Sequence, residues 1–319
     1  MAVHQLSLAE TLLDPRLGTN ARLDAIDKAI DWAPLERLAE QVHAGKLGRK
    51  PYRASAMIRA LYLQMLYGLS DPGLEEALTD RLSFRRFCGL GLDEATPDET
   101  TICRFRLAAA KKGVMQACFE EVNRQLDARG LIVRSGTLMD ATLLAAASRK
   151  PSMKAGAGAG LEREPGASWT RKNGKSHFGY RLHVATDQGF NLIRAVVLTP
   201  AHVGESPVAE TLIQGDEKAV YADKGYEHKE RRARLKARGV KDRICHRSHK
   251  HQTALPYWQT QRNTLIAKRR AMVEQVFGTT RRVFGYARAR STNFAVNLAD
   301  AFRLATVFNL RRVAGLPAR

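Results

Sequence analysis

The stretch AVYADKGYE (residues 219–227) ends a short apolar run with an aspartate, and a lysine, a glycine and a tyrosine follow it. Apolar runs of about four residues that stop at turn-forming residues are typical of buried strands. We therefore predict a strand here, with Asp223 at its carboxyl end. A carboxylate at that position needs an explanation, because the chain around it is strongly cationic.

The charge balance of the chain indicates its partner. The 319 residues include 52 Lys and Arg but only 32 Asp and Glu, a formal net charge of +20. An apolar fraction of 44% is that of a globular protein with a real core, and the length suits about two domains. Excess charge of one sign opposes compaction, so it favours a polyanionic partner over a merely basic soluble enzyme.

Other classes of protein are disfavoured by the motifs that the chain lacks. The four cysteines form no C-x-x-C pair, so neither a zinc ribbon nor a thioredoxin-like motif is indicated, and we expect reduced thiols. No apolar run approaches the roughly 18 residues of a membrane helix. The first 20 residues carry acids and lack a continuous apolar core, unlike a signal peptide. We expect a cytoplasmic, nucleoid-associated protein.

The first third of the chain reads as helical. SAMIRALYLQMLYGL (55–69) has apolar residues at helical spacing, and DPGLEEALTDRLSFRRFCGL (71–90) places a proline just inside a helix start. In TPDETTICRFRLAAAKKG (96–113), Thr96 and Glu99 form a capping-box pattern. We predict a helical DNA-binding and dimerisation domain over residues 1–130.

The last of these helices carries Arg104 and Arg106. A helix, a short turn and a basic helix are what a helix-turn-helix DNA-binding module requires. A helical bundle with a solvated basic face fits the same pattern, and both interpretations stay open.

From Gly136 onward the pattern alternates between strands and helices. Strands are predicted in residues 136–147, twice within 177–201 with a turn at 187–189, and in 240–247, besides the one at Asp223. Helices are predicted in 205–215 and 228–239, in a long segment after Arg262 that contains KRRAMVEQVFGTTRRVFGY, and in 297–313. Residues 150–168, rich in Gly, Ala, Pro and Ser, read as a flexible loop. This order predicts an α/β fold with a mixed sheet flanked by helices over residues 131–319.

Two further carboxylates stand where solubility does not explain them. Asp140 lies inside the apolar run TLMDATLL, where a charge is costly unless something pairs with it. Glu274 is the only acid between Asp242 and Asp300, and it stands among five basic residues. An ordinary i,i+4 pair with Arg270 explains Glu274 alone, but it does not explain three such carboxylates.

Two aspartates at strands and a glutamate on a helix can converge on one point. Oxygen ligands of this kind suit Mg²⁺ or Mn²⁺. Two such ions about 4 Å apart support in-line displacement at a phosphodiester, and the positive charge around them would hold a nucleic acid. We therefore predict a metal site of Asp140, Asp223 and Glu274 that holds two divalent ions.

At these same residues the chain resembles a known family. LMDATLL, YADKGY and RRAMVEQVFGTTRR resemble the catalytic motifs of DDE insertion-sequence transposases with a ribonuclease H-like core, and in particular of the insertion sequence five family. Residues 52–78 and 96–106 are similar to the helical domain of that family, and residues 168–187 to its second and third strands. The resemblance covers most of the chain.

The resemblance implies that Asp140, Asp223 and Glu274 are the catalytic, metal-binding triad. The family signature is a tyrosine, two residues, an arginine, three residues, a glutamate, six residues and a lysine. Arg270 and Glu274 match it, whereas Arg281 stands at the lysine position and Ala267 at the tyrosine position. Arg270 and Arg281 would bind phosphates near the scissile bond.

The function that this resemblance implies is DNA transposition, a recombination reaction. The enzyme would bind double-stranded DNA at the terminal inverted repeats of an insertion sequence, cut the ends and transfer them into target DNA, as a homodimer or larger assembly on DNA. A nuclease of the same fold without strand transfer and a non-catalytic DNA-binding relic are the alternatives. RNA binding lacks an aromatic-rich strand motif, and without a GxxxxGK[ST] loop we expect no nucleotide hydrolysis.

Several other residues allow two interpretations. Trp258 would stack on a flipped base or belong to the core, and we favour the core. Cationic side chains in loops or at strand ends would contact phosphates or only be solvated; they are Arg171, Lys172, Lys175 and Lys224. His177 and His183 alternate along a strand with nothing to separate core from site. The spacing of Cys245, His246, His249 and His251 matches no zinc pattern.

Overall fold

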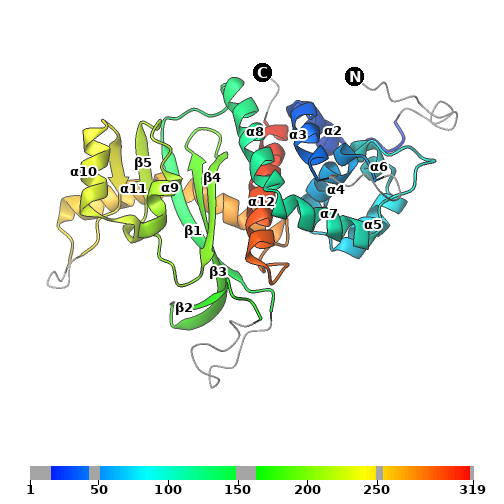
Figure 1. Ribbon diagram of the computed structural model, residues 1–319. Coiled ribbons are helices and arrows are strands. Elements are labelled where there is room, and N and C mark those ends of the chain that lie inside the picture. Colours follow the sequence, from blue (N-terminus) through cyan, green and yellow to red (C-terminus); the bar gives the residue numbers. More distant parts are fainter. Residues whose placement is uncertain (1–15, 43–50, 149–162, 249–253, 317–319) are drawn as a thin grey trace. The chain divides into compact units, whose positions relative to one another are not determined.

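The computed structural model describes residues 16–42, 51–148, 163–248 and 254–316 (Figure 1). The chain forms two compact units. One contains residues 1–125 and 302–319, and the other contains residues 126–301. They are described separately below.

The first unit is helical, as predicted. Its central helix, α4 (Ala54–Tyr67), is buried along most of its length and ends at Gly68, whose φ of 65° closes the helix in the left-handed region. Such a helix forms the core on which the others pack. The remaining helices are α2 (Ala21–Ala29), α3 (Ala33–Glu40), α5 (Asp71–Asp80), α6 (Leu82–Cys88), α7 (Glu99–Lys111), most of α8 (Val114–Ala128) and the later part of α12 (Phe294–Ala314).

Two local predictions in this unit need correction. Residues 71–90 form two helices, because the backbone of Arg81 is extended between α5 and α6. The cap of α7 is Asp98, whose Oδ1 accepts a hydrogen bond from the Thr101 amide at 2.7 Å. The predicted capping box of Thr96 and Glu99 is therefore wrong. The Thr96 hydroxyl instead lies 3.1 Å from that of Thr79.

The second unit contains a mixed six-stranded sheet, which confirms the predicted α/β class. The strands are β1 (Thr137–Ala145), β2 (Ser168–Lys172), β3 (Lys175–Asp187), β4 (Ile193–Pro200), β5 (Ala219–Ala222) and β6 (Lys241–Ile244). Their order is β2-β3-β1-β5-β6, and β4 also pairs with β3. The pairings of β3 with β1, β2 and β4 are antiparallel, whereas β1, β5 and β6 run parallel to one another (Figure 1).

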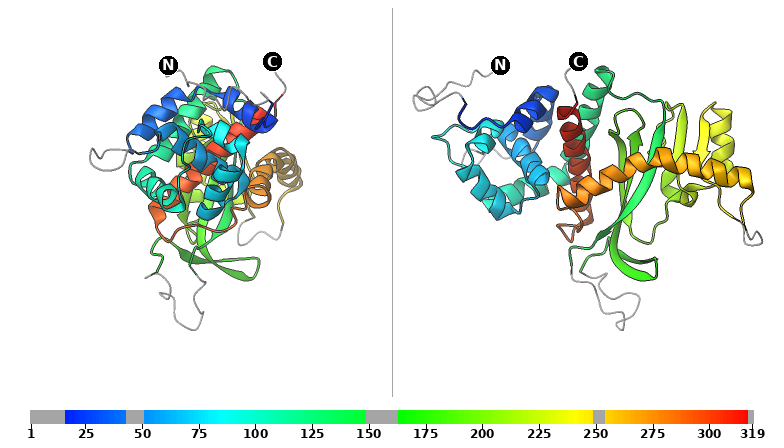
Figure 2. Two further views of the ribbon diagram at one scale, coloured as in Figure 1. Left: turned by 90° about the vertical axis from the view of Figure 1, so that its right-hand side faces the viewer. Right: turned by 180° about the vertical axis from the view of Figure 1, so that it is seen from behind.

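Helices cover the two faces of this sheet. Met139 of β1 belongs to a core cluster with residues of α9 (Ala209–Leu212) and α10 (Lys229–Ala237). The next residue, Asp140, points to the opposite face because side chains alternate along a strand. On that face lies α11 (Tyr257–Arg282), which contacts β1, β5 and β6 and crosses in front of them when seen from behind (Figure 2). Short 3₁₀ turns precede α9 (Ser206–Val208) and follow β5 (Lys224–Tyr226).

The predicted strands are all present, and two of the strands lie within residues 168–187. These two strands, β2 and β3, form a hairpin whose turn residues Asn173 and Gly174 both have positive φ, as a tight hairpin requires. The helix predicted in 205–215 is shorter than expected. The long helix α11 starts at Tyr257, earlier than predicted, because Pro256 stands at its cap. Most of the loop predicted in 150–168 lies outside the described residues.

Candidate active site

Asp140 and Arg270 form an ion pair between β1 and α11. Arg270 Nη1 donates to Asp140 Oδ2 at 2.6 Å, and each side chain is only 16–20% exposed. The other carboxylate oxygen of Asp140 accepts from the Ala141 amide at 2.8 Å. The costly charge within the apolar strand is therefore paired, as its position demanded. Arg270 pairs with a strand residue rather than along its own helix.

Asp223 lies beside Asp140 at the end of a neighbouring parallel strand. Leu138 of β1 pairs with Tyr221 of β5, and continuing this register by two residues brings Asp140 level with Asp223. Asp223 caps the turn Lys224–Tyr226 by accepting from the Lys224 amide at 2.7 Å. Asp140 within β1 and Asp223 just after β5 therefore lie side by side on adjacent parallel strands.

The charges of the two aspartates act on each other. Burial raises the pKa of Asp140, Arg270 lowers it, and the charge of Asp223 raises it further. Burial alone would lower the pKa of Arg270, but Asp140 and Asp223 together raise it. One guanidinium thus balances two carboxylates in this part of the sheet, which leaves net negative charge for another cation.

Glu274 is exposed on α11, one turn after Arg270. Among the residues that the structure describes, no three Asp, Glu, His or Cys side chains lie where they could hold one metal ion together. The structure therefore brings Asp140 and Asp223 together but does not bring Glu274 into contact with them. The convergence of the three stays a prediction.

A carboxylate that sequence reasoning missed lies near the two aspartates. Glu205, just before the turn Ser206–Val208, accepts from Arg181 at 3.0 Å. Burial raises its pKa, Arg181 lowers it, and the charges of Asp140 and Asp223 raise it. The sequence showed Glu205 only as the start of a short helix, with no signal of a site.

The donor set fits a hard divalent cation. The side chains in this part of the sheet offer carboxylate oxygens from Asp140 and Asp223, with Glu205 nearby. The fully buried hydroxyl of Tyr226 has no hydrogen-bond partner among the described residues. Its pKa is raised by burial and then by the charges of Glu205 and Asp140. Oxygen donors and an unsatisfied buried hydroxyl suit hydrated Mg²⁺ or Mn²⁺.

A cationic groove lies next to this site. Its volume is about 710 Å³, and it runs between the end of β1, the β2–β3 hairpin and the segment around Arg281. Arg281 also donates to Thr142 of β1 at 2.5 Å. The groove brings together three residues that we predicted for DNA binding and two that sequence reasoning did not assign to it: Lys172, Lys175 and Arg281, with His177 and Arg288.

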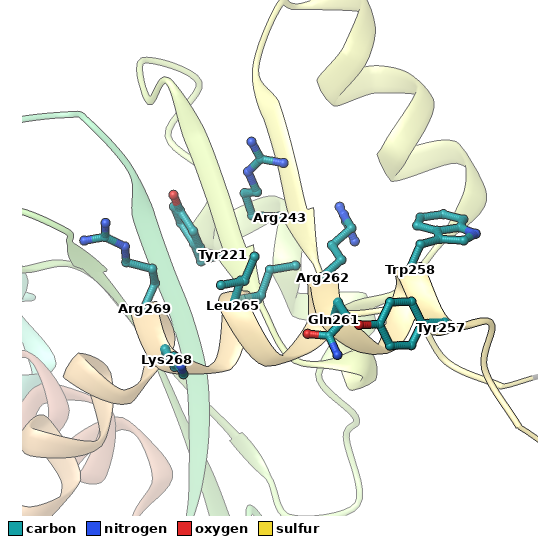
Figure 3. Close-up of a pocket in the computed structure, with 10 residues that line it drawn as sticks. Tyr221, Arg243, Tyr257, Trp258, Gln261, Arg262, Leu265, Lys268 and Arg269 are labelled. Carbon is teal, nitrogen blue, oxygen red and sulfur yellow. The ribbon is translucent and has the colours of Figure 1, made fainter.

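A second cavity, of about 810 Å³, lies between β5, β6 and the first turns of α11 (Figure 3). Tyr257 is 80% exposed and Trp258 59% exposed at its rim, so our preference for Trp258 in the core is wrong. The reason is the early start of α11, which places both rings on its first turn. In Figure 3, Arg262, Arg269 and Trp258 project from α11 toward the side where Tyr221 and Arg243 leave the strands.

The other basic residues that we singled out occupy different environments. Arg104 on α7 is exposed, whereas Arg106 is half-buried and donates from Nη2 to Asp71 Oδ2 at 2.8 Å. Arg171 and Lys224 are exposed.

The histidines divide in the same way. His183 is buried and lies 3.0 Å from the Thr199 hydroxyl, so it belongs to the core, whereas His177 is exposed in the cationic groove. Cys245 is buried, and the ring of His246 meets that of Trp258 edge-on at 5.4 Å. His249 and His251 lie outside the described residues.

Comparisons with known proteins agree with this geometry. Residues 132–310, more than half of the chain, match the family model described as a transposase DDE domain. Residues 11–107 match the model described as a transposase domain (DUF772). No solved structure matches the chain. Within the described part of the chain, no helix is long and apolar enough to cross a membrane.

Proposed function

The chain belongs to the DDE transposases, and we propose that it binds the terminal inverted repeats of its own insertion sequence, cuts the DNA at these ends and transfers them into target DNA. The observation that carries this proposal is the placement of Asp140, within β1, beside Asp223, which directly follows the parallel strand β5, with Arg270 paired to Asp140. The chemistry would leave 3′-hydroxyl groups, which attack the target phosphodiester directly.

The strand order supports a ribonuclease H-like core of the insertion sequence five type. In such a core the central strand carries the first aspartate and the adjacent parallel strand the second. Here β1 is central, with antiparallel β3 on one side and parallel β5 on the other. The motifs LMDATLL and YADKGY supply the two aspartates at these places.

Asp140, Asp223 and Glu274 would hold two divalent cations, Mg²⁺ or Mn²⁺. When bound, such ions activate the attacking oxygen and stabilise the leaving oxygen of an in-line displacement. Arg270 then exchanges its contact with Asp140 for a phosphate oxygen, for which a guanidinium offers two parallel hydrogen bonds. Glu274 would reach the site from the face of α11 that carries Arg270 and Arg281.

The DNA backbone would lie in the cationic groove. Lys172, Lys175 and Arg281 line it, and Arg171 and Lys224 stand exposed on adjoining segments. Trp258, at the rim of the second cavity, would stack on a base that leaves the duplex. In the helical unit, exposed Arg104 is a better candidate for a phosphate contact than Arg106, which Asp71 engages.

The reaction joins two ends in one event, so we propose a homodimer or larger assembly on the DNA. Such an enzyme works where the DNA is, on the nucleoid in the cytoplasm.

The proposal is tested by cleavage of a labelled duplex that carries the terminal repeat of the element, in Mg²⁺, Mn²⁺ or Ca²⁺. We expect 3′-hydroxyl ends with Mg²⁺ or Mn²⁺ from the wild type, and none from Asp223→Asn, although this variant still binds the duplex. Equal cleavage by both proteins would remove Asp223 from the site. Glu274→Gln tests the third ligand. If Glu274 binds the same ions as Asp223, this variant must abolish cleavage as Asp223→Asn does.

A metal-dependent nuclease without strand transfer is the competing function. Pre-cut ends separate the two, since a transposase joins them to a target plasmid and a nuclease leaves them free. Joined products that depend on Asp140 and Asp223 would decide for the transposase.

A further inference from the structure

Glu205 stands outside the DDE pattern, yet its carboxylate is held in place near the catalytic aspartates. Arg181 Nη1 donates to it at 3.0 Å, and both side chains are largely shielded, with 17% and 21% of their surface exposed. Arg181 is itself fixed, because its Nη2 donates to the Ala201 carbonyl at 3.2 Å. Glu205 is therefore not a solvated surface acid.

The carboxylate of Glu205 rests against the turn that Asp223 begins. A Cβ added to Gly225, two residues after Asp223, would overlap Glu205 Oε2. Gly225 has no positive φ that would itself require glycine, so close approach of this carboxylate explains the glycine in YADKGY. The Glu205 carboxylate therefore lies against the turn that follows Asp223.

Tyr226 gives an independent indication that this location holds a ligand. The side chain is fully buried, and its hydroxyl has no hydrogen-bond partner among the described residues. Burial raises its pKa, and the charges of Glu205, Asp140, Arg270 and Arg181 also act on it, so the charged groups of the acidic site lie near this side chain, which packs in the core cluster of Met139. A buried hydroxyl left unpaired is unfavourable, and a bound, hydrated cation would supply the missing hydrogen-bond partner.

We propose that Glu205 is a further carboxylate of the active site, whose charge strengthens the hold of Asp140 and Asp223 on divalent cations. This inference rests on the proposed function, since it needs a cation at these aspartates. Without the cation, Arg181 balances Glu205 as Arg270 balances Asp140. The two arginines keep a dense group of carboxylates stable until the site is filled.

The test is Mn²⁺ binding to the full chain without DNA, by calorimetry and by the electron paramagnetic resonance signal of free Mn²⁺. We expect Glu205→Gln to weaken binding about tenfold or more, as removal of a group next to the ligands does elsewhere. The matched control is Glu210→Gln. Glu210 also pairs with an arginine, Arg231, at 2.8 Å; burial raises its pKa and Arg231 and Arg234 lower it, so we expect Mn²⁺ affinity to stay at the wild-type value.

Arg181→Gln separates a charge effect from a structural one. If Glu205 acts on the cation through its charge, loss of Arg181 leaves that charge uncompensated, and Mn²⁺ affinity stays equal or rises. If the pair only braces the fold, Arg181→Gln and Glu205→Gln weaken binding alike, and the inference is overturned.

Gly225→Ala moves the Glu205 carboxylate without changing its charge, and we expect it to lower Mn²⁺ affinity. Gly204→Ala, where nothing lies within 4 Å of an added Cβ, leaves the affinity unchanged. Asp223→Asn tests the cation site itself. If it binds Mn²⁺ as the wild type does, the proposed cation site itself fails. If it loses Mn²⁺ while Glu205→Gln keeps wild-type affinity, only the role of Glu205 fails.

Discussion

Arg270 on α11 lies 2.6 Å from Asp140 on β1, so residues 130 positions apart share one ion pair at the centre of the candidate site. Because Asp223 is close to both, this guanidinium is the positive charge that balances the aspartates in the absence of a cation. The pair also fastens α11, which carries Glu274 and Arg281, to the sheet. In the proposed function, stability and catalysis would therefore depend on the same contact.

We predict that Arg270→Gln lowers the free energy of unfolding by about 2–4 kcal/mol in EDTA, because Asp140 is left as an uncompensated, largely buried charge. Urea unfolding measures this. Mg²⁺ should then stabilise the variant more than the wild type, since the ion replaces the lost positive charge. Arg269→Gln is the control: this neighbour is exposed, and its removal should change stability by no more than about 0.5 kcal/mol. Equal effects of the two substitutions would contradict the role of the ion pair.

Arg104 and Arg106 should differ in what they support. Arg106→Gln breaks the two-pronged pair with Asp71, which also accepts from Gln64 at 2.6 Å, so we expect a loss of about 2–3 kcal/mol in the stability of the helical unit. Arg104→Gln should leave stability unchanged but weaken DNA binding. Its plot of log affinity against log salt should flatten by about one unit, the signature of one lost phosphate contact. A fall in stability with Arg104→Gln and none with Arg106→Gln would reverse these assignments.

His183 makes the stability of the second unit (residues 126–301) depend on pH. Burial lowers its pKa from 6.5 to about 4, and Arg181 adds to the shift. The folded state thus keeps His183 neutral while the unfolded chain takes up a proton below pH 6.5, so stability falls as the pH drops from 6.5 toward 4. This term amounts to roughly 2–3 kcal/mol at pH 4.

Urea unfolding at pH 7, 6, 5 and 4 measures the term. We expect His183→Gln to flatten the slope of stability against pH. His177→Gln removes an exposed imidazole and should keep the wild-type slope. A His183→Gln slope equal to that of the wild type would show that other groups cause the acid sensitivity.

Local sequence patterns were enough to predict five of the six strands in the described sheet and the positions of the two aspartates, whereas β2 was expected only from the family resemblance. Strand alternation distinguishes Met139, which enters the core, from Asp140, which faces α11. The apolar run before Asp223 ends where β5 ends. Strand alternation and the end of an apolar run are properties of a single segment, so they can be recognised without knowing which distant residues the segment contacts.

What the sequence could not reveal depends on contacts between distant residues. Glu205 becomes part of the site through Arg181 and Gly225, each at least 20 positions away. Arg106 donates to Asp71, which lies 35 residues before it. The sequence does not show this pairing, so the positive charge of Arg106 suggested a contact with DNA. The preference for Trp258 in the core rested on its large aromatic side chain, whereas α11 starts at Tyr257 and leaves this side chain exposed.

The exposed ring of Trp258 leads to the last prediction. It stands at the rim of a cavity with Arg243, Lys268 and Arg269, which offers an aromatic face next to cations (Figure 3). Stacking on an unpaired base contributes about 1–3 kcal/mol, so Trp258→Ala should weaken binding of a terminal repeat with one unpaired nucleotide by roughly 5- to 150-fold. Fully paired duplex should bind nearly as before, because backbone contacts lie in the other groove. Thermal stability should also be unchanged, since the ring is 59% exposed.

Fluorescence of 2-aminopurine at the unpaired position reports the stacking directly, because a stacked base is quenched. The wild type should quench the probe and Trp258→Ala should not. Leu265→Ala is the matched control, since it removes exposed apolar surface from the same cavity without removing a ring. If Leu265→Ala weakens binding as much as Trp258→Ala, the cavity binds by apolar contact alone. If neither does, the unpaired base lies elsewhere and the exposed ring does not serve DNA binding.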